Sequence, residues 1–337
     1  MSQDRMQDAG CRKQESMSGY KMQEGVSLVT TPVKRRVNSG FAESRIPNPE
    51  SMSGFTLIEM IMVIVITGII GGMVAVFLKA PIQQYMDVSR RAELTDIADT
   101  ALYHLAGEIS TAVPNSLRVA GCGGIPCVEF LPTRDGGRYR AATASGSGDI
   151  LDFTIGDSSF DIVGSPIVFV AGDYIVVGST QSDGNPPYDT TAASGVLRAT
   201  STTGSLSKAT YTATQLPEFA RLSSQRFDVV DGAQQAVTYA CESVGTNASG
   251  NGTGQLRRYW KYGFYTTQAA PPITFQATVP LNATPVQSAI LADKVSGCVI
   301  DYAVANQRMG LLGVRLTLTS GGESVSLYQE IHVSNVP

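Results

Sequence analysis

One long apolar run dominates the pattern of hydrophobic and polar positions along the chain. Residues 55–78 read FTLIEMIMVIVITGIIGGMVAVFL, and Glu59 is the single charged side chain among them. As a helix these residues extend roughly 36 Å, which is enough to cross a bilayer. Lys79 and Pro81 follow directly. The pattern predicts a hydrophobic transmembrane or assembly helix over residues 55–81, and the sequence contains no second run of this kind.

Residues 82–113 change to the periodicity of an amphipathic helix. Apolar residues recur at intervals of three and four positions, which places them on one helical face. They are Leu94, Ile97, Ala98, Ala101, Leu102, Leu105 and Ile109. Pro114 and Asn115 predict the end of this helix. We expect its apolar face to dock on a sheet.

From residue 114 to residue 337 the pattern changes to short alternating runs separated by Gly, Asp, Asn and Pro, which indicates strands and turns. Strands are predicted at 128–131, 150–155, 166–170, 174–177, 226–230, 236–241, 255–264, 298–304, 313–319 and 324–333. Ser320-Gly321-Gly322 predicts a hairpin between the last two. Long loops are expected near 178–222 and 242–254. The predicted fold class is therefore α+β, with a long N-terminal α-helix packed on a largely antiparallel, β-rich head.

The carboxylate of Glu59 lies within the apolar run and needs an oppositely charged partner, because an isolated acidic side chain in a membrane costs several kcal/mol. In an ordinary signal peptide the small residue at the cleavage site follows the apolar core, whereas here Gly54 precedes it. Cleavage between Gly54 and Phe55 would leave a new amine at Phe55, one helical turn from Glu59. The amine of one subunit can pair with the Glu59 carboxylate of a neighbour inside a filament and so fix the register. The alternative is a glutamate tolerated near the membrane interface.

The sequence Gly54-Phe55-Thr56-Leu57-Ile58-Glu59, followed by about twenty apolar residues, resembles the class III signal of type IV prepilins and type II secretion pseudopilins. The resemblance implies a type IV pilin fold, cleavage after Gly54 by prepilin peptidase, N-methylation of Phe55 and assembly through Glu59. The implied partners are other major and minor pilins, the inner-membrane assembly platform and, before assembly, the lipid bilayer. The implied location is the inner membrane, with a single span and a periplasmic head, and then the pilus on the cell surface.

The segment before the expected cleavage, residues 1–54, departs from this family, whose leaders are short and basic. Lys34-Arg35-Arg36 and Arg45 supply positive charge on the cytoplasmic side of the span, in line with the positive-inside rule. Met52-Ser53-Gly54 would itself make a minimal leader if translation began at Met52. Residues 1–54 are therefore interpreted as a cleaved leader or as a misassigned N-terminal extension.

The head, of over 200 residues, is long for a major pilin and indicates a minor subunit. Residues 114–119, 127–130, 259–262 and 332–337 resemble minor pilins of the mannose-sensitive haemagglutinin (MSHA) pilus. Residues 92–109 resemble both these pilins and the J-type pseudopilins of type II secretion. The resemblance implies a minor pilin that primes assembly or caps the filament tip. Two alternatives stay open: a tip adhesin or DNA-binding minor pilin, and a type II secretion minor pseudopilin.

Charge and candidate chemistry exclude several other classes of function. The net charge of the chain is −4, and 17 basic residues against 23 acidic ones follow Gly54, so no nucleic-acid partner is expected. The two histidines, His104 and His332, lie far apart in the sequence, so neither a histidine metal site nor a catalytic triad is predicted. We expect no enzymatic activity, no metal and no cofactor.

One basic and aromatic cluster is a candidate ligand contact because arginines and aromatic rings can stack on bases or sugars. It consists of Arg257, Arg258, Trp260 and Lys261. The alternative interpretation is a strand with its aromatic residues inward and its cations in solvent.

The chain has five cysteines. Cys11 lies in the leader and would stay in the reducing cytoplasm. The remaining four form an even set, typical of disulfides in an oxidising periplasm, and three pairings are formally open. We favour Cys122–Cys127, because a Gly-Gly-Ile-Pro loop joins them, and Cys241–Cys298, because both lie on predicted strands.

Overall fold

The computed structural model describes residues 54–119, 122–143, 146–154, 156–179, 186–190, 195–212, 215–221, 223–268, 286–302 and 310–333. The chain divides into two compact units, Met1–Val65 and Ile66–Pro337. The described part of the first unit is the beginning of helix α1 (Leu57–Ser110), and the second unit holds the rest of α1 and the β-rich head. The predicted leader, residues 1–53, and its Cys11 lie outside the described residues.

Helix α1 is continuous over 54 residues, or about 81 Å at 1.5 Å per residue. The two helical segments predicted at 55–81 and 82–113 are therefore one element. Pro81 lies inside α1 and does not end it, although proline lacks the N–H group that one bond of the helical ladder needs. The helix ends at Ser110, just before Pro114.

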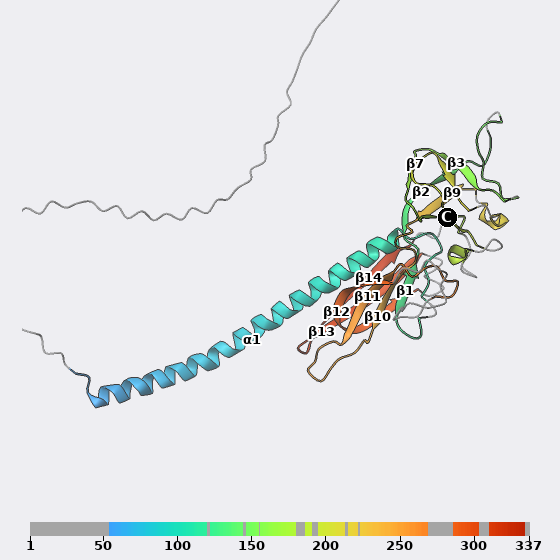
Figure 1. The fold of residues 1–337 in the computed structure, drawn as a ribbon. Coiled ribbons are helices and arrows are strands. Elements are labelled where there is room, and N and C mark those ends of the chain that lie inside the picture. The colour runs from blue at the N-terminus through green and yellow to red at the C-terminus, as the bar shows by residue number, and fades with distance from the viewer. Residues whose placement is uncertain are drawn as a thin grey trace, which may run out of the picture. The chain divides into compact units, whose positions relative to one another are not determined.

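The C-terminal part of α1 buries the face that its periodicity predicts. Six of the seven apolar residues are buried, and Ile97 packs against them at the edge. Leu105 and Ile109 have no exposed surface at all. Their neighbours in the core come from a sheet that lies along this end of the helix (Figure 1), and include Phe130, Tyr239 and Leu316.

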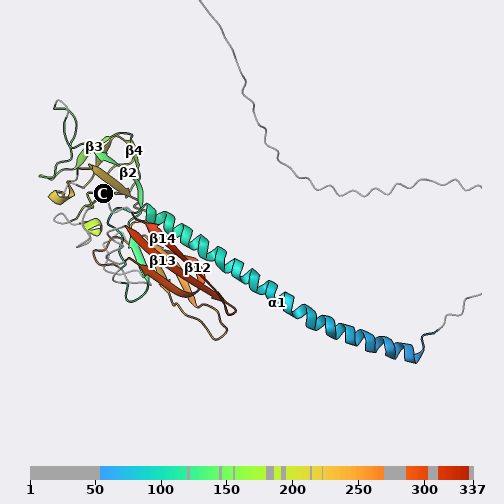
Figure 2. The same cartoon turned by 180° about the vertical axis from the view of Figure 1, so that it is seen from behind.

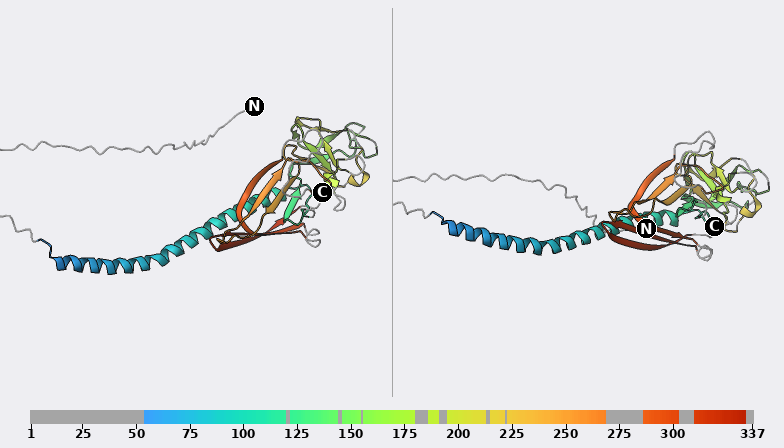
Figure 3. Two further views of the ribbon diagram at one scale, coloured as in Figure 1. Left: turned by 60° about the horizontal axis from the view of Figure 1, so that its bottom comes forward. Right: turned by 90° about the horizontal axis from the view of Figure 1, so that it is seen from below.

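The first sheet has six antiparallel strands in the order β1-β10-β11-β12-β13-β14. Their bounds are β1 (Cys127–Phe130), β10 (Val237–Glu242), β11 (Gly254–Trp260), β12 (Gln287–Asp301), β13 (Leu311–Ser320) and β14 (Glu323–His332). Figure 3 shows this sheet curving around the C-terminal part of α1, with orange strands on one side and red strands on the other. Side chains alternate between the two faces of a strand, so that Val237, Tyr239 and Cys241 pack toward α1 whereas Ala240 faces away from it.

The predicted hairpin at Ser320-Gly321-Gly322 is confirmed. Strands β13 and β14 pair along their full length, with Ser320 opposite Glu323. Gly321 and Gly322 alone form the loop, and both have positive φ, at 59° and 83°. Two consecutive positive φ angles define the type I′ turn, which matches the twist of the strands and favours glycine.

A second sheet with a separate core lies beyond the C-terminal end of α1 (Figures 1 and 2). Its order is β6-β5-β9-β2-β3-β8, and β4 pairs with β7 beside it. The bounds are β2 (Thr133–Tyr139), β3 (Ser159–Val163), β4 (Ile167–Phe169), β5 (Tyr174–Val177), β6 (Leu197–Ala199), β7 (Gly204–Leu206), β8 (Lys208–Thr210) and β9 (Arg226–Val230). Two short 3-10 helices, η1 (Pro186–Tyr188) and η2 (Glu218–Ala220), accompany them. Aromatic rings fill the core, and Phe160 contacts Tyr139, Tyr211 and Phe227 with ring centres 5.0–6.2 Å apart.

Most predicted strands are confirmed, and the exceptions have identifiable causes. The strand predicted at 150–155 is wrong over its described residues, since Leu151 and Phe153 are buried without belonging to a strand. Asp152 prevents pairing there, because its carboxylate accepts hydrogen bonds from the backbone and hydroxyl of Thr154 (2.8 and 2.7 Å). Strand β11 ends at Trp260 and does not reach 264, because Lys261 turns the chain with a φ of 63°.

The loops were predicted with mixed success. The connection near 242–254 is confirmed between β10 and β11. The described residues of 178–222, expected to be a long loop, contain β6, β7 and β8 instead. Residues 303–304 at the end of one predicted strand lie outside the described residues.

Asp228 is an acidic residue on an inner strand of the second sheet. It lies on β9, opposite Val176 of β5 and Gly136 of β2. Burial raises the pKa of its carboxyl to about 6, and Arg226 offsets only part of that rise. The ionised form of Asp228 therefore opposes folding at neutral pH.

Replacing Leu105 should test the interface between α1 and the first sheet. Leu105→Ala removes a side chain with no exposed surface and should lower the free energy of unfolding by about 2–5 kcal/mol. The matched control is Tyr103→Ala on the solvent face of α1, where the ring is 74% exposed, and its effect should be small. Urea denaturation of the full chain in lipid nanodiscs measures both, and equal effects would contradict this packing.

Replacing Asp228 should change how stability depends on pH. The pKa of about 6 exceeds the unfolded value, so the native protein loses stability as pH rises from about 4 to about 6. Asp228→Asn should remove that loss and be more stable by up to about 3 kcal/mol at pH 7.5, with no advantage at pH 3.5. Thermal melts at both pH values measure the difference, with Asp99→Asn on the exposed face of α1 as the control. An Asp228→Asn variant that gains nothing at pH 7.5 would argue against a buried charged carboxylate.

Candidate assembly site and its connection to the head

The N-terminal part of α1 exposes a long, predominantly apolar surface. The large exposed apolar residues from Phe55 to Val88 are Phe55, Leu57, Ile58, Met60, Ile61, Met62, Val63, Ile64, Val65, Ile66, Ile69, Ile70, Met73, Val74, Val76, Phe77, Leu78, Ile82, Tyr85, Met86 and Val88. The helix is long and apolar enough to cross a membrane, and its most apolar window is not buried within the protein. Such a surface requires lipid or other protein around it, because leaving it in water is unfavourable. The helix therefore indicates a single-pass membrane anchor.

Glu59 lies in the first turn of this exposed helix. The backbone N–H of Glu59 donates to the Thr56 hydroxyl (3.3 Å) and to the Thr56 carbonyl (3.0 Å). Thr56 thus caps the helix, and Glu59 occupies the third helical position, which is the Thr-x-x-Glu spacing of a capping box. A carboxylate here faces the positive end of the helix dipole, four residues after Phe55. Thr56 was missed in the sequence analysis, although the Thr-x-x-Glu spacing before an apolar run signals it.

Gly54 and Phe55 precede the helix and are exposed. A Cβ added to Gly54 would meet no atom within 4 Å, so the described fold places no steric demand for glycine at this position. Phe55 is 77% exposed. The bond between them is accessible in the described structure.

Ion pairs mark the place where α1 leaves the first sheet. Arg91 of α1 donates to the carboxylate of Glu323 on β14 (2.6 Å), and Lys294 of β12 pairs with Glu93 of α1 (2.9 Å). The neighbouring Arg90 lies over Gly321 in the hairpin. Leu94, the first fully buried residue of the helix, follows directly. Each exposed pair contributes little energy, but together they define where the free part of α1 begins.

The predicted ligand cluster on β11 is divided between the two faces of the first sheet. Arg258 lies on the face toward α1, where it donates to the carboxylate of Glu108 (2.9 Å) and stacks over Trp260 at 4.8 Å. Arg257 lies on the opposite face, where it pairs with Glu242 (3.5 Å). The two arginines, expected together, therefore do not share a surface. Lys261 follows the strand and is half-buried.

Each arginine of that cluster has a carboxylate partner within the chain, Glu242 for Arg257 and Glu108 of α1 for Arg258. The Arg258 contact joins the last turn of α1 to the middle of the sheet, so it positions the helix end. Glu108 was not singled out from the sequence, because its partner lies far along the chain. No sequence pattern signals such a pair.

A buried polar network joins strand β1 of the first sheet to residues of the second core. The fully buried carboxylate of Glu129 on β1 accepts from Arg118 (2.9 Å) and from the Tyr262 hydroxyl (2.9 Å). Arg118 also covers the ring of Tyr188 in η1 at 3.7 Å and donates to the carbonyl of Tyr265 (2.7 Å). Burial raises the pKa of Glu129, and the charge of Arg118 and the hydroxyl of Tyr262 partly offset this. In the sequence, the signal for this network is Glu129, an acidic residue inside the otherwise apolar stretch Cys127–Phe130.

The structure joins the four cysteines of the head in two disulfides. Cys122 is bonded to Cys127, with Cα atoms 6.2 Å apart, and Cys241 to Cys298, with Cα atoms 6.3 Å apart. The first closes a short loop before β1. The second connects β10 to β12, which are both neighbours of β11. Disulfides of this kind indicate an extracytoplasmic head. Among the described residues, no group of three or more His, Cys, Asp or Glu could hold a metal ion.

The long apolar helix, with its C-terminal part packed on an antiparallel sheet, is a pilin-like α+β architecture. Compared with models of known protein families, with curated proteins and with solved structures, the chain finds no match. The architecture and the exposed helix are therefore the grounds on which function is argued.

Removing each disulfide should destabilise the head to a different degree. The cysteines are separated by 57 positions in Cys241–Cys298 and by 5 in Cys122–Cys127. Loop-closure entropy then assigns about 4 kcal/mol to the first bond and about 2 kcal/mol to the second. Urea denaturation of the paired alanine variants, each in nanodiscs, compares them under non-reducing conditions. A larger loss for the Cys122→Ala/Cys127→Ala pair would contradict this order.

Proposed function

We propose that the chain is a minor pilin, made as a prepilin, of a type IV pilus of the MSHA type and similar to the MshO-type subunits. Prepilin peptidase cleaves it after Gly54 and methylates Phe55. The mature subunit then joins the filament, at or near its tip, and helps to prime assembly. The observation that carries the proposal is the exposed apolar helix with Glu59 in its first turn.

The assembly step follows from the surface of α1. Before assembly, lipid covers the apolar residues, and in the filament the helices of other pilins replace it. The exchange costs little hydrophobic free energy, because both surroundings are apolar. The charge of Glu59 then decides the register, since an unpaired carboxylate is costly in an apolar environment. The amine that cleavage creates at Phe55 of a neighbouring subunit supplies the opposite charge.

The head supports this proposal by leaving the helix free. The first sheet covers α1 only from the ion pairs at Arg91 and Glu93 onward, so the preceding residues remain available to neighbours. The two disulfides suit a head that folds in the periplasm. We propose that the protein has no enzymatic activity and acts through its partners: the peptidase, the other pilins and the inner-membrane assembly platform.

The alternative of a ligand-binding tip subunit loses its candidate cluster, because Arg257 and Arg258 lie on opposite faces and are paired with carboxylates. The alternative of a type II secretion minor pseudopilin shares the same helix and the same processing. The resemblance of four head segments to MSHA minor pilins favours the pilus.

Mass spectrometry of the N-terminal peptide should test the processing. In cells with active prepilin peptidase, the mature chain should begin at N-methylated Phe55, and Gly54→Val should leave it uncut. Added side-chain atoms at Gly54 contact nothing in the fold, so an uncut variant reports recognition by the peptidase. An intact wild-type chain in such cells would overturn the proposal.

A second variant should separate processing from assembly. Glu59→Gln should be cleaved normally but recovered in sheared filaments at a level at least several-fold lower, because it cannot pair with the new amine. The matched control is Asp96→Asn, which neutralises an exposed acid elsewhere on α1 and should assemble as the wild type does. Equal recovery of both variants would remove Glu59 from the assembly step.

A further inference from the structure

Strand β14 lies at one end of the first sheet and pairs on one side only, with β13. It has ten residues and extends about 33 Å at about 3.3 Å per residue. The other strands that end a sheet are shorter, because β1 has four residues and β6 and β8 have three each. Among the described strands in these end positions, β14 therefore offers the longest edge.

The register of the hairpin determines which backbone groups of β14 face this edge. In a two-residue hairpin the closing pair, here Ser320 and Glu323, exchanges both backbone hydrogen bonds, and bonded pairs then alternate with unbonded ones. The bond from the N–H of Val333 to the carbonyl of Gly310 (2.7 Å) fits this alternation. The even-numbered residues of Ser324–His332 therefore direct five N–H and five C=O groups away from β13.

The core beneath β14 is incompletely covered at the same edge. On the neighbouring β13, the four inward apolar side chains are at most 1% exposed: Leu312, Val314, Leu316 and Leu318. Val325 and Leu327 continue this face on β14, and they are only partly buried. A further strand would cover them, because side chains on one face of neighbouring strands pack against each other.

The sequence of β14 lacks the usual protection of an edge strand. Edge strands are commonly protected from pairing by proline, lysine, a bulge or a covering element. Strand β14 contains neither proline nor lysine, and its register with β13 has no shift. Its ion pair with α1 is formed by its first residue, Glu323. A long, regular edge of this kind favours recognition by strand addition.

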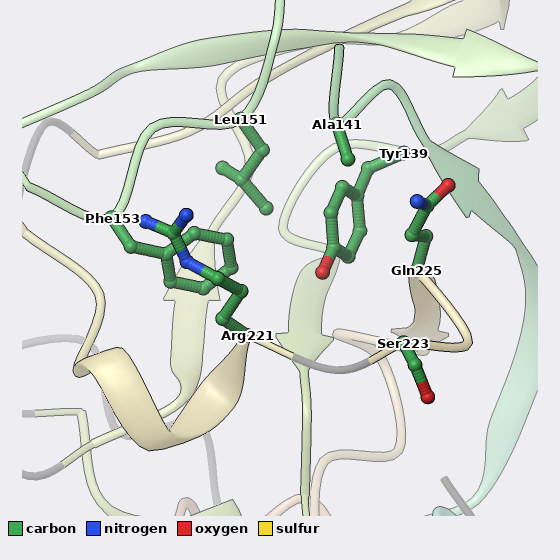
Figure 4. A pocket seen from close by; sticks show the side chains of 7 residues that line it. All are labelled: Tyr139, Ala141, Leu151, Phe153, Arg221, Ser223 and Gln225. Carbon is green, nitrogen blue, oxygen red and sulfur yellow. The ribbon is translucent and has the colours of Figure 1, made fainter.

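The second sheet offers no comparable opening in its described part. Its cavity of about 280 Å³ is lined in part by Tyr139, Leu151 and Phe153 (Figure 4). These three side chains are at most 4% exposed, and the Arg221 guanidinium lies 5.1 Å from the centre of the Phe153 ring. The protein itself thus already covers the apolar lining of this cavity.

A second copy of the chain does not suit the edge of β14. Both α1 and β14 run away from the end of the sheet where Arg91 pairs with Glu323. Antiparallel pairing of two β14 strands would place the two α1 anchors at opposite ends of the joined sheet, where one membrane cannot hold both. Parallel pairing of the same edges would turn the two inward faces to opposite sides, which sets polar side chains beside Val325 and Leu327.

Charge specifies the partner further. Glu330 lies on the outward face of β14, where it accepts from the Tyr328 hydroxyl (3.1 Å). Across the sheet, Gly313 separates Glu330 from a second acid, Asp301. Opposite charges on neighbouring strands attract, so a basic residue is favoured beside Glu330.

We propose that β14 binds, by strand addition, an extended segment of a different protein chain. The segment carries apolar residues on its inward side and a basic residue opposite Glu330. This interaction goes beyond assembly through α1, and its test does not depend on filament formation.

A peptide that copies β13, residues 311–320, is the probe for this edge. Its sequence, LLGVRLTLTS, alternates apolar and polar residues and holds one arginine that can lie opposite Glu330. Fluorescence anisotropy with the full chain in lipid nanodiscs should show saturable binding, and amide hydrogen exchange in β14 should slow when the peptide is bound. A control peptide, N-methylated at the residues copied from Gly313, Arg315 and Thr317, should not bind because it cannot donate to β14.

Two outcomes of this experiment would overturn the proposal. One is the absence of saturable binding by the β13 peptide, or equal binding by its N-methylated control. The other is exchange in β14 that slows with rising protein concentration in the absence of peptide, because it would indicate pairing between copies of the chain.

Two substitutions at Ser326 separate backbone pairing from side-chain contact. Ser326→Pro removes an N–H that faces the open edge and is not used in pairing with β13, a position where an edge strand tolerates proline. It should weaken peptide binding at least about fivefold, the value of one backbone hydrogen bond. Ser326→Ala removes the hydroxyl but keeps the N–H, and should bind as the wild type does. Thermal melts verify folding, and equal binding by the two folded variants would contradict strand addition.

A charge exchange tests the position of the basic residue. Glu330→Lys should weaken binding of the β13 peptide several-fold, because two cations then lie side by side. A peptide with glutamate in place of its arginine should restore the affinity for this variant. Failure of the exchange in a folded Glu330→Lys chain would contradict the placement of a basic residue opposite Glu330.

Discussion

The apolar surface of α1 is the constraint on which the rest of the structure depends. From Phe55 to Val88 the helix exposes large apolar side chains, and their contact with water would be unfavourable by tens of kcal/mol at about 25 cal/mol per Å². Lipid or other protein must cover this surface. The head therefore has to fold on the remaining part of the helix without covering the first.

The head meets this requirement by dividing two kinds of interaction along α1. Apolar packing from Leu94 to Ile109 supplies the stability. Ion pairs at the two ends of this packed part fix the position of the helix on the sheet. Arg91 pairs with Glu323 where the helix leaves the sheet, and Arg258 pairs with Glu108 where the helix ends. Surface pairs add little energy, yet their geometry restricts rotation and sliding of the helix on the sheet. Arg258, one residue of the basic cluster that looks like a ligand site in the sequence, thereby helps to hold the helix.

The sequence predicted the elements whose patterns are local. The helical face of α1 and the Gly321-Gly322 hairpin follow from spacing within a few residues, because helix periodicity and type I′ turn geometry are short-range properties. Strand β12 was predicted only in its last part, because register shifts near Val295 and Gly297 break the alternation on which such predictions depend. Strand β2 resembles a turn in sequence, with two consecutive glycines. In the fold Gly137 pairs with Phe227, and glycine suits this position because an added Cβ would lie 2.8 Å from the Ile167 side chain and 3.2 Å from the Phe227 ring.

The pairing of distant polar residues was beyond prediction from the sequence for a different reason. Glu129 and Arg118 stand close in sequence, but their burial depends on Tyr262 and Tyr188, which come from distant parts of the chain. A buried ion pair of this kind contributes little net stability, because desolvation opposes the attraction. Its structural effect is to join strand β1 of the first sheet to the aromatic core of the second sheet. The first sheet thus contacts α1 through one face and the aromatic core through the other.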